Sequence, residues 1–384
     1  MGREAIPQNL RRMRQQRGWS QQGIAERAGL SLSGYCKIEK GQSVPGVDAL
    51  EGLAKALGIG IQAMLRPIFA IQHVRFRRLR KLKLKSREQI LVDVGRWYHD
   101  YAQLEEALHD TRAYLLNGFQ APGEGIPRAI NAAQLVRTKM NLNGEAVQDP
   151  CGLIDAMRIK VLKVVVATDG FFGLSIMDET HGPAVVVNVW ERIPVERWIF
   201  SAFHEVGHLL LHLPSYRITD DIEEPEGEER EADAFASHFL MPEGKFRKRW
   251  QETAGLGLVD RVLKVKRIFK VSYRSVLYRL KPMYPTENLF MRFAWQYKAL
   301  YERDLREHQE PEPKLHPQAF DNKVLVPELD PLSASDFCED RLEMLVRKAV
   351  LKGEISFNRG AEILNLQLET MRSVAATWHM DPED

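Results

Sequence analysis

The sequence has few cysteines, no long apolar run and almost no net charge. Its three cysteines, Cys36, Cys151 and Cys338, are far apart and form no CxxC pair, so we expect reduced thiols in a reducing compartment. No stretch approaches the roughly 18 uninterrupted apolar residues of a membrane helix. The N-terminus also lacks the apolar core and cleavage site of a signal peptide. These absences predict a cytoplasmic protein that makes no contact with a membrane.

The length and the distribution of charge favour several domains with different partners. The 384 residues suffice for two or three domains that each bury a core. Residues 1–90 hold 18 Lys and Arg against 6 Asp and Glu, whereas the remainder holds 36 against 46. A basic first part beside an acidic remainder predicts that contact with nucleic acid is confined to the first part.

The first 66 residues follow the pattern of a helix-turn-helix built from five short helices. Ser20 and Ser31 each stand where a hydroxyl can cap the start of a helix. Between them, Gly29 can adopt the left-handed conformation that ends a helix in a tight turn. From apolar spacing and caps, helices are predicted at Ile6–Arg17, Gln21–Arg27, Leu32–Glu39 and Val47–Leu57.

The same segment carries residues in register with a known family. They are Trp19–Gln22, Ala25, Gly29, Ile38, Glu39 and Leu53–Ile59. With them the segment resembles the XRE (Cro/C1-type) helix-turn-helix, which lays its third helix in the major groove of DNA. The DNA contacts that this resemblance implies are Gln21, Gln22, Ser31, Ser33 and Lys37. The alternative is that the helical unit binds a protein.

The run His204-Glu205-Val206-Gly207-His208 is the most specific chemical pattern. Helical residues four apart share a face about 5–6 Å from each other, so His204 and His208 can hold one ion. Glu205 then points beside the ion, where it can take a proton from the attacking water and pass it to the leaving amine. Small Gly207 allows another segment to come close. Zn²⁺ is the expected ion, with Mn²⁺ as an alternative in activity.

A third ligand is required, and two positions compete for it. His212 lies one turn beyond His208, but that spacing is not usual for three ligands. Glu229 and Asp233 lie four apart on the next predicted helix, so we expect Glu229 to ligate and Asp233 to accept the second N–H of a ligand histidine. The alternative is a solvated acidic helix start, because residues 220–233 hold nine acids.

Three linked stretches carry a second resemblance, namely Phe203–His212, Glu229–Ala236 and Leu240–Pro242. With them the chain resembles the ImmA/IrrE family of metallopeptidases, and weaker similarity extends from about Arg128 to Leu280. The resemblance implies a gluzincin-like site, with zinc on His204, His208 and Glu229 and with Glu205 as the base. Members of that family cleave helix-turn-helix repressors. At Asp233 this sequence replaces the asparagine often found there.

The predicted fold is therefore mainly α with a small β-sheet (α+β). Strands are expected at Lys160–Ala167, Gly170–Ile176 and Ala184–Val189. The expected division is a DNA-binding domain at 1–66, a basic linker and bridging helix at 67–120, a zinc peptidase domain at 121–250 and a helical region at 251–384. That last region is expected to end in a second helix-turn-helix-like unit, Ile355–Trp378.

Some sequence patterns leave the interpretation open. The basic segment Arg75–Arg87 could track phosphates or could be a solvated linker whose leucines pack on a neighbouring domain. No spacing separates Tyr216, His238 and His181 as stabilisers of the oxyanion. The oligomeric state is also open, and a homodimer is one alternative.

The sequence favours a DNA-associated zinc endopeptidase that cleaves a repressor or antitoxin-like protein. A second hypothesis is a helix-turn-helix regulator or antitoxin whose peptidase-like domain serves sensing or structure. A third is cleavage of the chain itself, in the loop Ala121–Pro127, to release the DNA-binding unit.

Overall fold

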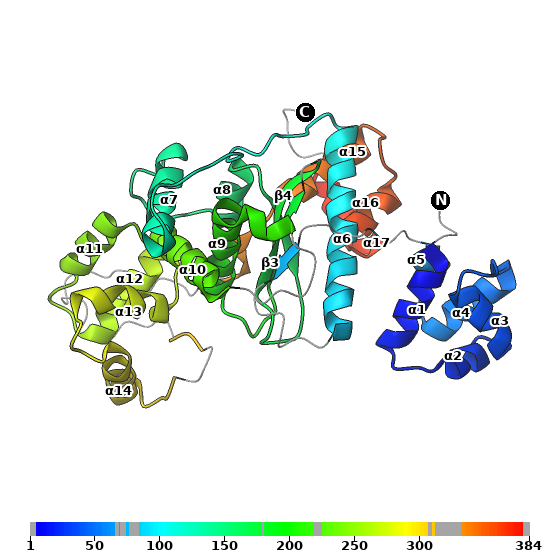
Figure 1. Cartoon of the computed structure of the whole chain (residues 1–384), viewed down its shortest axis with the longest axis horizontal. Coiled ribbons are helices and arrows are strands. Elements are labelled where there is room, and N and C mark those ends of the chain that lie inside the picture. The colour runs from blue at the N-terminus through cyan, green and yellow to red at the C-terminus, as the bar shows by residue number, and fades with distance from the viewer. Residues whose placement is uncertain are drawn as a thin grey trace. The chain divides into compact units, whose positions relative to one another are not determined.

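The computed structural model describes residues 5–65, 69, 74–76, 84–178, 180–217, 225–305, 309–311 and 332–378. The chain divides into two compact units, Met1–Ile71 with Leu79–Ala107 and Gln72–Arg78 with Leu108–Asp384. The prediction of a mainly helical protein with one small sheet is confirmed (Figure 1). Among the described residues, no helix combines the length and apolar character needed to span a bilayer.

The first unit begins with the predicted helix-turn-helix. Ser20 accepts a hydrogen bond from the Gly23 amide and Ser31 accepts one from the Gly34 amide, so both serines are N-caps as expected. Gly29 has a φ of 69° in the turn between the two helices. The helices are α1 Ile6–Gln16, α2 Gln21–Arg27, α3 Leu32–Glu39, α4 Val47–Leu57 and α5 Ile61–Leu65.

Helix α6, Leu84–Ala107, completes the first unit. It ends at Ala107, well before residue 120, where the predicted segment of basic linker and bridging helix ends. Beyond it, His109 has a φ of 52°, a left-handed conformation that does not continue an α-helix. The prediction that the bridging helix extends beyond Ala107 is therefore wrong.

The second unit holds one sheet of four strands in the order β1-β3-β4-β2. The predicted strands appear as β2 Lys160–Val164, β3 Gly173–Asp178 and β4 Gly182–Asn188. Strand β1, Val74–Phe76, was not predicted, because three residues in a basic segment show no strand periodicity. It pairs antiparallel with β3, whereas β2 and β4 run parallel.

The helices beside this sheet carry the site. Helix α9, Val195–Leu211, packs on β3 and β4, and α10, Glu226–Leu240, packs on α9 (Figure 1). Fifteen of the 17 residues of α9 are buried, so its polar side chains lie in a dry environment. The neighbouring elements are α7 Gly125–Lys139, α8 Pro150–Ala156 and the 3₁₀ turn η3 Leu213–Arg217.

The remaining helices follow α10 in sequence. They are α11 Glu243–Glu252, α12 Leu258–Phe269, α13 Tyr273–Leu280, α14 Leu289–Tyr301, α15 Arg341–Leu351, α16 Phe357–Ile363 and α17 Leu368–Thr377, with 3₁₀ turns η4 Lys281–Met283 and η6 Ala334–Phe337. Asn365 joins α16 to α17 with a φ of 54°, as Gly29 joins α2 to α3. The cap of the first helix matches as well, since Ser356 accepts a hydrogen bond from the Arg359 amide, whereas α17 follows Gln367 and has no side-chain cap.

Candidate metal centre

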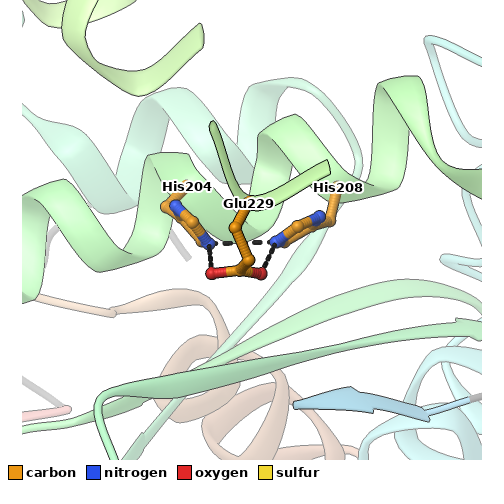
Figure 2. A group of neighbouring side chains, drawn as sticks. All are labelled: His204, His208 and Glu229. Carbon is orange, nitrogen blue, oxygen red and sulfur yellow. Dashed lines mark hydrogen bonds and ion pairs between the residues drawn. The ribbon is translucent and has the colours of Figure 1, made fainter. Parts of the chain in front are cut away.

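Three side chains from two helices meet beside the sheet. His204 and His208 come from α9, and Glu229 comes from the first turn of α10 and lies between the two rings (Figure 2). Both histidines are buried. The structure thus brings together the three residues that the sequence nominates as ligands.

The spacing of their donor atoms fits one small cation. The two Nε2 atoms lie 2.9 Å apart, and Glu229 approaches His208 Nε2 at 3.0 Å and His204 Nε2 at 3.5 Å. Donors about 2.0–2.1 Å from a tetrahedral zinc ion are separated by roughly 3.4 Å. Among the described residues, this is the one group of three His, Cys, Asp or Glu donors compact enough for a metal, with all donor atoms within 4.8 Å.

The ionisation of Glu229 suits a ligand. Burial by itself raises the pKa of this carboxyl group, but hydrogen bonds from His204 and His208, together with their charge, outweigh burial and hold the pKa well below its usual range. The carboxylate is therefore ionised, which is the form that binds a cation.

Close packing between α9 and α10 depends on Gly207. A Cβ atom at this position would lie 3.2 Å from the Ala232 Cα and 3.1 Å from the Phe235 ring. Both neighbours belong to α10. The expectation that Gly207 lets another segment approach is confirmed, and that segment is the helix that delivers Glu229.

The Nδ1 atom of each of the two histidines also has a polar partner. Asp233 Oδ1 lies 2.8 Å from His204 Nδ1, in the position expected for it. His212 Nδ1 lies 2.9 Å from His208 Nδ1, and its other nitrogen lies 3.5 Å from Glu231. His212 therefore stands behind a ligand, outside the ligand group itself. The four-residue spacing from His208 was the sequence signal for this contact.

A serine of the sheet holds the Glu205 carboxylate in place. Ser175 on β3 donates a hydrogen bond of 2.6 Å to Glu205 Oε2, and the Tyr216 hydroxyl of η3 donates one of 2.7 Å to Ser175 Oγ. All three residues are buried. Sequence reasoning missed Ser175, because nothing in a strand pattern marks one serine as the partner of a helix residue 30 positions away.

The three candidates for stabilising the oxyanion have different surroundings. Tyr216 is linked to Glu205 through Ser175. His181 lies 3.3 Å from Asp178 in the turn between β3 and β4. His238 contacts Arg279 at 2.6 Å, and burial, followed by the charge of that guanidinium, lowers the pKa of His238 to about 4.

A cavity of about 650 Å³ adjoins the centre through Asp233. Its walls come from α9, α10, α13, η4 and the ends of neighbouring segments. Aromatic rings from Phe172, Phe200 and Phe290 line it, as does Tyr278, which is 63% exposed. The five arginines in its lining outnumber the three acids, and Asp233 is already engaged with His204.

The residues proposed for DNA contact differ in availability. Gln22, Ser33 and Lys37 are exposed. Gln21 instead donates a hydrogen bond to Glu39. The buried Glu39 carboxylate also accepts two hydrogen bonds from the Arg14 guanidinium. Ser31, the N-cap of α3, is exposed as well. Gln21 therefore contributes to the structure of the unit in addition to any role at its surface.

Comparison with known protein families matches two segments of the chain. Residues 172–281 match the family model of the IrrE N-terminal-like domain, Peptidase_M78, and residues 10–63 match that of a helix-turn-helix, HTH_3. The chain therefore carries an XRE-type helix-turn-helix domain and an ImmA/IrrE-like peptidase-type domain. Together they define a DNA-binding regulator with a peptidase-type domain.

No curated protein matches this chain. A solved structure, the apo form of ComR from S. thermophilus, is 14% identical over 97% of this chain and 94% of that chain, with a TM-score of 0.16. That score is too low to support a statement about the fold.

Proposed function

We propose that this protein is a DNA-associated zinc-dependent endopeptidase that cleaves a regulatory protein. The observation that carries the proposal is the convergence of His204, His208 and Glu229 next to a buried Glu205 held by a hydroxyl. A site that only bound metal for structure would have no use for a positioned carboxylate beside the ligands.

The chain's own residues have distinct roles in this proposal. His204, His208 and Glu229 would hold the ion, which as a Lewis acid would polarise the scissile carbonyl. Glu205 accepts a proton from the attacking water and delivers it to the leaving amine, so its charge is restored after each cycle. Ser175 fixes the Glu205 carboxylate in the orientation that this transfer needs.

The cavity beside the centre indicates the kind of chain that is cut. Arg192 and Arg274 line the cavity, and neither forms an ion pair with a described residue. Arg274 lies over the ring of Tyr273, which also lines the cavity, and Arg192 lies over that of Trp190. With aromatic walls beside them, these cations favour a substrate segment that carries acidic and apolar side chains. A helix-turn-helix repressor or antitoxin-like protein with such a segment is the proposed substrate.

The test uses the full chain loaded with zinc or manganese. It is incubated with a tryptic peptide library and with the repressor encoded nearest to its gene, and products are identified by mass spectrometry. Discrete cuts are expected from the wild type and from Glu226→Gln, which alters an exposed residue of α10, but not from Glu205→Gln. Equal products from all three would assign the cleavage to a contaminant.

The main alternative is a regulator whose peptidase-type domain senses a ligand without cutting. It predicts no cleavage by the wild type, together with DNA binding that responds to occupancy of the cavity. Measuring DNA binding of the wild type and of Glu205→Gln in the same preparation separates the two hypotheses.

A further inference from the structure

Strand β1 occupies an edge of the sheet that would otherwise be open. In the order β1-β3-β4-β2, β3 is interior only because Val74–Phe76 pairs with it. Without β1, the N–H and C=O groups along the outer side of β3 would be available to any extended chain. Backbone pairing of this kind is a general way to bind a peptide.

The paired part of β3 lies beside the catalytic glutamate. Arg75 is opposite Ser175, the residue whose hydroxyl contacts Glu205. Neighbouring strands are about 4.8 Å apart, so the β1 backbone lies one strand spacing from that serine. Turn η3, which carries Tyr216, borders β1 as well as β3. A blue arrow, the colour of the segment around residue 75, lies below the three ligands in Figure 2.

The N-terminal end of β3, which lies beyond its pairing with β1, runs toward the Glu205 carboxylate. Register with β1 covers Leu174–Ile176, and Gly173 lies just beyond it. A Cβ atom on Gly173 would lie 3.4 Å from Glu205 Cγ, so this stretch of backbone runs directly past the proposed base. A peptide laid along β3 in place of β1 would therefore pass Glu205.

We infer that residues 74–76 are an internal competitor for β3, the strand along which a substrate would lie. The inference rests on the proposed function, since inhibition requires an activity. Within the described residues, three residue pairs join β1 to β3. A substrate strand that forms the same backbone bonds, and also places side chains in the cavity, can therefore displace it.

The first test detects docking without catalysis. A double variant, Val74→Pro with Arg75→Pro, removes a ladder donor whichever of the two residues directs its N–H toward β3. Val74→Ala with Arg75→Ala is the matched control that keeps both donors. In a Glu205→Gln background, a fluorescent peptide with the sequence of Gln72–Arg78 is expected to bind the proline variant at least about tenfold more tightly than the control, by anisotropy.

Hydrogen exchange locates that binding. Amides of β3 are expected to exchange faster in the proline variant and to regain protection when the peptide is added. Equal peptide affinity for both variants, or no change in β3 protection, overturns the inference. If circular dichroism shows that the proline variant is unfolded, Val74→Gly with Arg75→Gly takes its place.

The activity assay separates the two hypotheses. With metal and an intact Glu205, the proline variant is expected to cleave library peptides about tenfold faster than the alanine control. Peptide docking on β3 with no cleavage by any variant contradicts the proposed function alone. Cleavage at equal rates contradicts the inference alone. A cut within Gln72–Arg78 of the wild type, found by intact mass, would also overturn it, because β1 would then be a substrate.

Discussion

Ser175 Oγ donates to Glu205 Oε2 over 2.6 Å, which links the sheet to the base of the proposed reaction. Replacing Ser175 with Ala removes this donor and leaves the carboxylate free to rotate. We expect kcat to fall about tenfold with little change in KM, because orientation affects the transition state more than binding. Steady-state kinetics on a cleaved library peptide provides the measurement, and retained metal content is the control. A change confined to KM would contradict an orienting role.

Metal binding depends on both histidines of α9. His208→Ala removes one of three ligands, so purified protein is expected to lose most of its bound metal in mass-spectrometric elemental analysis. His181→Ala, a histidine outside the ligand group, is expected to retain it. Metal at 1,000 times its Kd stabilises a fold by about 4 kcal/mol. A chelator should therefore lower the Tm of the wild type and leave that of His208→Ala unchanged.

Gly207→Ala tests the packing of the two ligand-bearing helices. The added methyl group would lie 3.1 Å from Phe235 and 3.2 Å from Ala232, so α10 must shift outward. We expect a loss of about 1–3 kcal/mol in the free energy of unfolding and weaker metal affinity. Gly244→Ala, where nothing lies within 4 Å, is the matched control and should stabilise α11 by up to about 1 kcal/mol. The same sign for both variants would rule out the packing argument.

The depressed pKa of His238 predicts a dependence of stability on pH. This ring has a pKa of about 4 in the folded chain, against about 6.5 when unfolded. Below pH 6.5 the unfolded state gains a proton that the folded state does not, so stability is lost as the pH falls from 6.5 toward 4.

The variant His238→Asn removes the imidazole that takes up this proton in the unfolded state. Between pH 7 and pH 5, the free energy of unfolding of the wild type should fall about 1 kcal/mol more than that of His238→Asn, after allowing for partial exposure of the ring. Urea midpoints of the full chain at both pH values give the difference. Parallel losses in the two proteins would place the pH sensitivity elsewhere.

Lys37 is the exposed cation on α3 that we expect to contact DNA. If it meets a phosphate, Lys37→Ala weakens binding to a random-sequence duplex and reduces the slope of log affinity against log salt by about 1. Lys55→Ala is the control, because it changes an exposed residue of α4 outside the predicted interface. An unchanged slope in Lys37→Ala would favour the alternative that this unit binds protein.

Local patterns account for most of what the sequence predicted. The helix-turn-helix follows from Ser20, Gly29 and Ser31, whose effects act over three or four residues. His204 and His208 meet because a helix fixes their spacing, and Glu229 could be proposed because its own helix sets its register with Asp233. Each of these signals is contained within one element or one turn.

Contacts between distant elements were beyond such patterns. Ser175 reaches Glu205 only because β3 packs on α9, and a strand gives no sign of which helix will cover it. Strand β1 is defined by its partner, since its three residues have no periodicity of their own. His212 was visible by spacing, but its contact with His208 Nδ1 depends on how the last turn of α9 is packed.

Strand β1 is tethered at both ends. The chain enters the second unit at Gln72 and leaves it after Arg78, and on either side it belongs to the unit that carries the helix-turn-helix. A segment held this way competes at an effective concentration set by the chain itself, in the millimolar range for short connections. If residues 74–76 compete for β3 as inferred, dilution of the protein does not release that strand, because the competitor and the docking strand belong to one chain.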